Sequence, residues 1–194
     1  MDRYKLIIDT LGKERFKFDE PISDHAASNI GGKAKVFFIV FSVWEISKIV
    51  DMCQTLKLPF FIFGTGSKIM ISDQGLDCLV IKNRTRKIEI ISVKGRVSKI
   101  GIGVEEALVE VESGVSINRF IEFLDSQNLK SDDLGRISGS IGGNLFINKI
   151  LQNMVKSIKV LDLNSRILEI GAKDLSLRKH IILSAVFQIK SKLL

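Results

Sequence analysis

Two short stretches rich in glycine and serine carry the residues best suited to hold a ligand. The first, FGTGSKIMISD, covers residues 63–73, and the second, ISGSIGGN, covers residues 137–144. Glycine lets backbone N–H groups approach a ligand closely, and adjacent N–H groups form a concave nest for anionic oxygens. Two such turns in one chain predict a large phosphate-bearing ligand that is held at two places.

The composition favours a folded chain in a reducing compartment. The 194 residues suffice for one sizeable domain or two small lobes, and 45% are apolar while only two are proline. Cys53 and Cys78 have no metal-ligand spacing and lie in apolar surroundings, so free buried thiols are expected. With no signal peptide and no apolar run of about 20 residues, we expect a cytoplasmic protein and no membrane span.

The net charge of +7 is the only feature that suggests nucleic acid as a partner. The lysines and arginines are scattered along the chain, and aromatic residues do not alternate with them in a binding signature. Nucleic acid is therefore not expected. We interpret the charge as a solvated basic surface whose field also attracts a phosphorylated ligand.

A strand–helix–strand unit is expected to position the first turn. Residues 35–41 are typical of a buried strand, and residues 45–56 have apolar positions near the helical period, with Ser42 as N-cap. Pro59 ends this helix and residues 60–63 form the next strand, so a right-handed parallel crossover is predicted. The first turn follows that strand directly, where ligands bind in open α/β sheets.

The sequence before this unit and after it predicts further short elements. Residues 1–30 are polar and mixed, apart from a short helix over residues 4–11. A strand is expected over residues 78–82. Three short β segments are expected over residues 87–112, with a hairpin-like turn at residues 94–96.

The last part of the chain should hold two helices and three strands. An amphipathic helix is predicted over residues 116–127 with Ser116 as its cap, and a short helix over residues 144–151. The strands are expected over residues 157–162, 166–171 and 181–190, with a turn at Asn164 and Ser165. The whole pattern predicts an α+β fold with two lobes, residues 1–83 and 84–194.

Five blocks of this sequence, in the same order, resemble the flavin-binding part of the UDP-N-acetylmuramate dehydrogenase family, the UDP-N-acetylenolpyruvoylglucosamine reductases of peptidoglycan precursor synthesis. The likeness covers roughly residues 22–190. The blocks are AASNIGGKA, GTGSKIMISD, VEVESGVSINRFIEF, RISGSIGGNLFIN and the late strands VKSIKVLD and IILSAVFQIK. The resemblance implies the two-lobed FAD-binding fold of the vanillyl-alcohol-oxidase (PCMH) type.

The same resemblance implies that FAD is the cofactor. The first turn would bond to the FAD pyrophosphate, the second would approach the flavin and its phosphates, and Ile141 would pack nearby. Gly66→Val is expected to weaken binding by blocking the approach of the pyrophosphate. The cofactor-binding residues expected are Phe63, Gly64, Thr65, Gly66, Ser67, Lys68, Ser138, Gly139, Ser140, Gly142, Gly143 and Asn144. In this family NADPH reduces FAD, which passes hydride to the substrate, while the protein supplies orientation and electrostatics.

The sequence also departs from the family, so no catalytic residue is assigned. The substrate domain, with its serine proton donor and catalytic glutamate, has no counterpart here. Arg136, Ser138 and Lys149 replace residues of the family's second turn, and Arg178 is interpreted as an exposed residue of a short loop. Two interpretations stay open: a flavoprotein whose reductase activity is lost or depends on another chain, or a non-catalytic structural module with a protein partner on the surface left by the missing domain.

Overall fold

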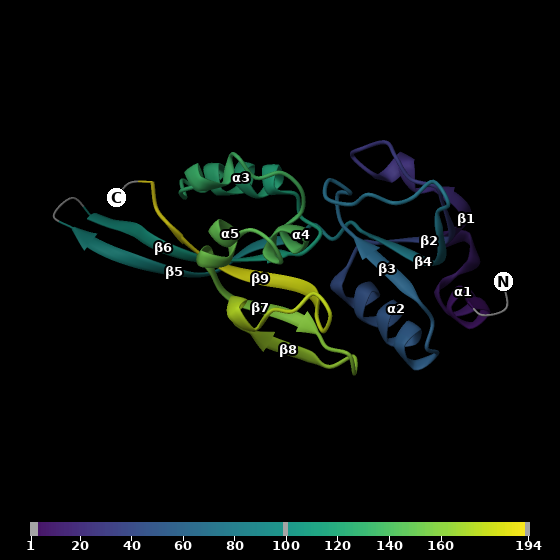
Figure 1. Cartoon of the computed structure of the whole chain (residues 1–194). Coiled ribbons are helices and arrows are strands. Elements are labelled where there is room, and N and C mark those ends of the chain that lie inside the picture. Colours follow the sequence, from purple (N-terminus) through teal and green to yellow (C-terminus); the bar gives the residue numbers. More distant parts are fainter. Residues whose placement is uncertain (1–3, 99–100, 193–194) are drawn as a thin grey trace.

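Two β-sheets lie side by side along the molecule, each with helices packed on it (Figure 1). This computed structural model describes residues 4–98 and 101–192. The first sheet has the strand order β1-β2-β4-β3 and the second the order β5-β6-β9-β7-β8. The α+β architecture predicted from the sequence is confirmed. We propose that the boundary between the lobes falls at residues 83–84, between the last strand of the first sheet and the first strand of the second.

The first sheet contains the predicted strand–helix–strand unit. Helix α2 (Val43–Thr55) connects β2 to β3, and its N-cap Ser42 accepts a hydrogen bond from the N–H of Glu45, as expected. Strands β2 and β3 are both parallel to β4, which lies between them, whereas β1 is an antiparallel edge strand that the sequence did not predict. The strands are β1 (Phe16–Pro21), β2 (Lys33–Val40), β3 (Phe60–Phe63) and β4 (Leu76–Asn83).

Apolar side chains are buried on both faces of this sheet. Ile46, Ile49 and Cys53 of α2 pack on one face, together with Ile7 of α1 (Lys5–Leu11). A smaller cluster fills the other face, consisting of Ile22, Ala34, Phe37, Phe63, Ile71 and Val80. Because both faces are covered, the inner part of β2 and the whole of β3 are continuous apolar runs rather than alternating patterns.

The second sheet is antiparallel throughout, and its long first hairpin corrects one prediction. The prediction of a hairpin-like turn at residues 94–96 is wrong, because these residues lie inside β5 and pair with residues 103–106 of β6. The pairing shifts between Lys94 and Gly95, which is the mark of a β-bulge rather than a chain reversal. The strands are β5 (Ile88–Ser98), β6 (Gly101–Glu112), β7 (Val155–Leu161), β8 (Ile167–Ile170) and β9 (Ile181–Lys190).

Three helices cover one face of the second sheet (Figure 1). The helix α3 (Ile117–Ser126) begins as predicted at Ser116, whose side chain accepts from the N–H of Arg119. The prediction of a single short helix over residues 144–151 is wrong. It is replaced by α4 (Ile141–Leu145) and α5 (Lys149–Met154), because Asn148 caps a new helix by accepting from the N–H of Leu151.

Contacts between the lobes hold the two sheets together. Leu161 of β7 and Leu183 of β9 are buried in the same apolar cluster as α2. The side chain of Gln54 donates to the carbonyl oxygen of Asp162 at 3.3 Å and accepts from the hydroxyl of Ser165. No helix in residues 4–98 and 101–192 has both the length and the apolar character that crossing a membrane requires.

Candidate functional site

A cavity of about 700 Å³ opens where the two lobes meet, at the carboxyl end of β3. Its lining comes from segments far apart in the sequence. The first lobe contributes Gln54, residues 60–69 and Asn83, and the second contributes Ser113, Ser140, Gly142, Gly143, Phe146, Ile147 and residues 161–163 and 177–182. Both turns singled out in the sequence therefore line the same cavity.

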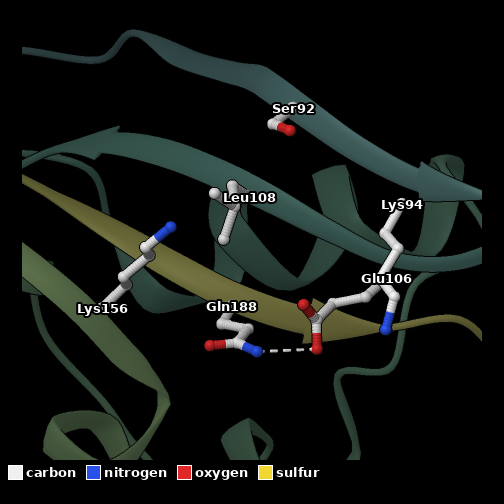
Figure 2. Close-up of a pocket in the computed structure, with 6 residues that line it drawn as sticks. All are labelled: Ser92, Lys94, Glu106, Leu108, Lys156 and Gln188. Atoms are coloured by element: carbon white, nitrogen blue, oxygen red, sulfur yellow. Dashed lines mark hydrogen bonds between the residues drawn. The ribbon is translucent and has the colours of Figure 1, made fainter.

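A second hollow, on the open face of the second sheet, is much smaller. Figure 2 shows its side chains, among which the amide of Gln188 donates to the carboxylate of Glu106 at 2.8 Å. The hollow has a volume of about 120 Å³, and Lys94 beside it is paired with Glu105 at 3.3 Å. A dinucleotide is far larger than this hollow, so the cavity between the lobes is the candidate site.

The first turn has a row of backbone donors at the cavity. Residues 64–68 all line it, and none of their five N–H groups donates to an acceptor within residues 4–98 and 101–192. The hydroxyls of Thr65 and Ser67 lie 3.2 Å apart on the same turn. Consecutive N–H groups without protein acceptors form the kind of nest that binds anionic oxygens.

The second turn is held in shape from behind by Asn144. This side chain is fully buried, and its amide nitrogen donates to the carbonyl oxygens of Ser138 and Ser140, both at 2.9 Å. The amide oxygen of Asn144 is buried and has no partner among the described residues. Of the predicted residues on this turn, Ser140, Gly142 and Gly143 line the cavity, whereas Ser138, Gly139 and Asn144 do not.

The two turns approach so closely that only glycine fits at their contact. A Cβ atom on Gly64 would lie 2.3 Å from the hydroxyl oxygen of Ser140. A Cβ atom on Gly139, where φ is +105°, would lie 2.6 Å from the hydroxyl oxygen of Ser67 and 3.4 Å from Cε of Lys68. One ligand can therefore contact both turns at once.

Gly66 is required for a reason other than the predicted approach of the ligand. Its φ is +77°, and a Cβ atom there would lie 2.5 Å from the carbonyl oxygen of His25 and 2.8 Å from Cα of Ala26. A side chain at this position would therefore strike the backbone that supports the turn, in a conformation that L-residues rarely adopt. Gly66 is therefore required for the backbone conformation of the turn.

The charges around the cavity favour an anionic ligand. Lys68, Arg178 and Lys179 line it, and Asp162 is the one carboxylate among the described lining residues. The backbone N–H and the guanidinium of Arg166 bond to Asp162 and hold the pKa of that carboxyl below its usual range. Arg178 and Lys179 are exposed, as the sequence predicts for Arg178, and both line the cavity.

Apolar side chains form a large part of the lining, and the sequence analysis missed most of them. Phe63 was predicted, but Phe61, Phe146, Ile147 and Leu177 were not. No local pattern distinguishes these residues from other surface or core residues, so only a comparison of complete folds would have found them. Ile141, expected near the cofactor, does not line the cavity and is instead fully buried in the core of the second lobe.

These features together fit a ligand with an anionic centre and a flat apolar part. The row of N–H donors suits a pyrophosphate, the cations add attraction, and the aromatic lining suits a ring system. A volume of about 700 Å³ lies within the usual range of about 300–1,000 Å³ for ligand and cofactor pockets.

The comparison with family models defines the class of this protein. The FAD binding domain family matches residues 34–171, so the chain belongs to that family, and FAD is the cofactor that this membership indicates. Its curated relatives include UDP-N-acetylenolpyruvoylglucosamine reductase of Alkaliphilus metalliredigens, 27% identical over 90% of this chain and 55% of the relative. The same enzyme of Clostridium perfringens is 25% identical over 98% of this chain and 64% of the relative.

Solved structures confirm the fold at lower identity. UDP-N-acetylenolpyruvylglucosamine reductase from Thermus caldophilus superposes with a TM-score of 0.67 at 14% identity, over 91% of this chain and 62% of that one. The 4-ethylphenol oxidase from Gulosibacter chungangensis gives 0.66 at 14% identity, over 98% of this chain and 42% of that one. The resemblance predicted from the five sequence blocks is confirmed, and the chain spans 55–64% of the length of these two curated relatives.

Proposed function

We propose that this chain binds FAD in the cavity between its lobes, with the pyrophosphate on the first turn. The observation that carries the proposal is that residues 64–68, which line the cavity beside the second turn, have five consecutive N–H groups with no acceptor among the described residues. The hydroxyls of Thr65 and Ser67 and the ammonium of Lys68 add further donors to the same oxygens.

The second turn completes the proposed site from the other lobe. Ser140, Gly142 and Gly143 present backbone and hydroxyl groups to the cofactor, and Phe63 packs beside it. Ser138, Gly139 and Asn144 act indirectly, because they set the shape of this turn without lining the cavity. Bound FAD supplies hydride transfer, and the residues of this chain bind and orient it.

We further propose that the chain provides the flavin-binding part of a UDP-N-acetylenolpyruvoylglucosamine reductase. The curated relatives with that name support the substrate class. The 194 residues alone are not expected to reduce that substrate, since they match only 55–64% of those enzymes and their cavity holds one lining carboxylate, which is paired with Arg166. A cytoplasmic location and the absence of nucleic acid as a partner remain parts of this proposal.

One observation favours a second candidate function, the binding of a protein partner or further domain. Ile147, Leu163 and Leu177 line the cavity from three separate segments, yet their exposed fractions are 64%, 63% and 76%. Exposed apolar groups that gather at one place often mark a contact surface. On this alternative the fold is a structural module, and the partner covers the cavity mouth.

Titration of the purified apoprotein with FAD, followed by visible absorption and flavin fluorescence, separates the two candidates. We expect saturable binding of one FAD per chain, after which anaerobic addition of NADPH tests reduction of the bound flavin. Absence of binding at tens of micromolar FAD would refute the flavoprotein proposal and leave the structural module.

A further inference from the structure

A buried lysine without a carboxylate partner lies directly beneath the first turn. Lys82, on β4, is only 6% exposed. Its ammonium contacts two neutral acceptors, the carbonyl oxygen of His25 at 3.2 Å and Nδ1 of the same residue at 3.3 Å. Among the described residues no carboxylate lies within ion-pair distance of it. Burial of a cation without a counter-charge costs free energy, so its position calls for an explanation.

The surroundings of His25 fix the orientation of this lysine. The ring stacks on Phe37 with centroids 4.4 Å apart, and its Nε2 lies 2.8 Å from the carboxylate of Glu20. Because an ammonium only donates, Nδ1 must accept from Lys82, and Nε2 therefore carries the proton and donates to Glu20. The histidine thus holds the ammonium in one place without neutralising it.

The same ammonium is separated from the first turn by a single carbonyl group. The carbonyl oxygen of His25 that accepts from Lys82 is also the atom that a Cβ on Gly66 would meet at 2.5 Å. The N–H of Ala27 donates to the carbonyl of Gly66 at 3.2 Å, which ties this backbone to the turn. The ring of Phe63, 5.8 Å from the ammonium, closes the other side.

We propose that Lys82 is the buried counter-charge of the anionic group that the first turn binds, acting through the turn without touching the ligand. This inference rests on the proposed function, since it places the cofactor's pyrophosphate on residues 64–68. Within residues 4–98 and 101–192 the ammonium has no carboxylate partner, and its pKa is lowered by burial and then by the nearby cation of Arg84. A phosphate on the far side of the turn supplies the missing negative charge.

The test compares Lys82→Met with Lys48→Met, which removes the same charge from an exposed position on α2 of the same lobe. Methionine is an unbranched side chain only one atom shorter than lysine, and it suits the apolar ring of Phe63 beside this position. We expect Lys82→Met to weaken FAD binding about tenfold or more, as follows from one charge several ångströms away at an effective dielectric constant of about 20. Lys48→Met should bind like the wild type.

The stability of the apoprotein distinguishes this role from a structural one. Removing a buried, unpaired charge should leave the thermal midpoint of apo Lys82→Met unchanged or raise it, whereas a structural lysine would lower it. Equal FAD affinity in Lys82→Met and wild type overturns the inference. A lower thermal midpoint of the apoprotein in both Lys82→Met and Lys82→Gln also overturns the inference.

A second probe separates failure of this inference from failure of the proposed function. Inorganic pyrophosphate, followed by thermal shift, reports the anion site without the flavin. If the wild type binds pyrophosphate but not FAD, the cofactor proposal fails, and the comparison with Lys82→Met still decides the role of the lysine. If the wild type binds neither probe, both proposals fail.

Discussion

The glycines of the two turns are required for different physical reasons. Gly66 has a left-handed backbone and no room for a side chain against His25, so it serves the shape of its own turn. Gly64 has no positive φ, and the side chain of Ser140 in the other lobe is what restricts it among the described residues. Replacement of Gly66 should therefore disturb the first turn alone, whereas replacement of Gly64 should disturb the contact between the two turns.

Gly66→Ala is expected to destabilise the protein and to weaken FAD binding together. The positive φ and the clash at 2.5 Å place this change among the strained substitutions, which cost about 1–3 kcal/mol. Urea unfolding of the apoprotein and FAD titration measure the two effects. Gly135→Ala is the matched control, because Gly135 has helical backbone angles and open space around its Cβ position. A stable Gly66→Ala variant would contradict this account.

The thiol of Cys53 should make the stability of the protein depend on pH in the alkaline range. Burial, and then the neighbouring Cys78, raises the pKa of this thiol from 9.0 to about 12. Below pH 9 the thiol is protonated in both the folded and the unfolded chain. Between pH 9 and 12 only the unfolded chain loses this proton, so the free energy of unfolding falls as the pH rises.

Urea unfolding between pH 8.5 and 10.5 measures this effect, with Cys53→Ala as the comparison. The variant is less stable at every pH because of the cavity it creates, but its free energy of unfolding should fall less steeply with pH. Equal slopes in the two proteins would show that Cys53 ionises at an ordinary pKa in the folded state.

At the scale of elements, the site depends on how the second turn and α4 meet β3 across the lobe contact. Ser140 contributes both the hydroxyl that faces Gly64 and the N-cap of α4, accepting from the N–H of Gly143. The elements are individually short, and α4 has five residues. Their positions are therefore set by packing against neighbouring elements rather than by helix propensity.

Gly64→Ala should weaken FAD binding, and Ser140→Gly should restore part of the loss in the double variant. The added methyl group would lie 2.3 Å from the Ser140 hydroxyl oxygen and 2.8 Å from its Cβ, both of which the second change removes. Ser140→Gly alone should cost little stability, since glycine is tolerated at N-caps, and should lower FAD affinity only by the contribution of the lost hydroxyl. FAD titration of the two single variants and the double variant gives the coupling. Strictly additive effects would show that the turns do not touch in solution.

At the scale of the whole molecule, the cavity belongs to neither lobe alone. Its lining comes from both, and the lobes share an apolar cluster and the hydrogen bonds of Gln54. If FAD binds in this cavity, as we propose, it will stabilise both lobes at once, by about 2.7 kcal/mol at a concentration 100 times its dissociation constant.

Bound FAD should therefore make the two lobes unfold together. Trp44, the single tryptophan, lies on α2 and reports unfolding of the first lobe by its fluorescence, whereas far-ultraviolet circular dichroism reports both lobes. With saturating FAD we expect the two urea transitions to coincide and to shift upward equally. A shift seen in only one of the two signals would place the cofactor within a single lobe.

Elements whose signals are local were predicted from the sequence with accurate bounds. The strands β3 and β9 match the predicted residues, and α2 and α3 begin at the serine caps that were expected. The strand β1 was missed because its sequence, FKFDEP, contains charges and a proline and becomes a strand through pairing with β2. The turn predicted at Gly95 failed for a similar reason, since pairing with β6 converts it into a bulge.

The sequence by itself determined the family, the positions of the two glycine-rich turns and the order of most of the elements. These features are encoded in contiguous residues, where caps, periodicity and glycine-rich motifs act over a few positions. Only the tertiary structure decided that Gly64 abuts Ser140, that Gly66 packs on His25 and that Lys82 lies beneath the first turn with no carboxylate partner in the part of the chain that the structure describes. Those properties depend on close approach and burial between segments far apart in the chain, and no local pattern carries that information.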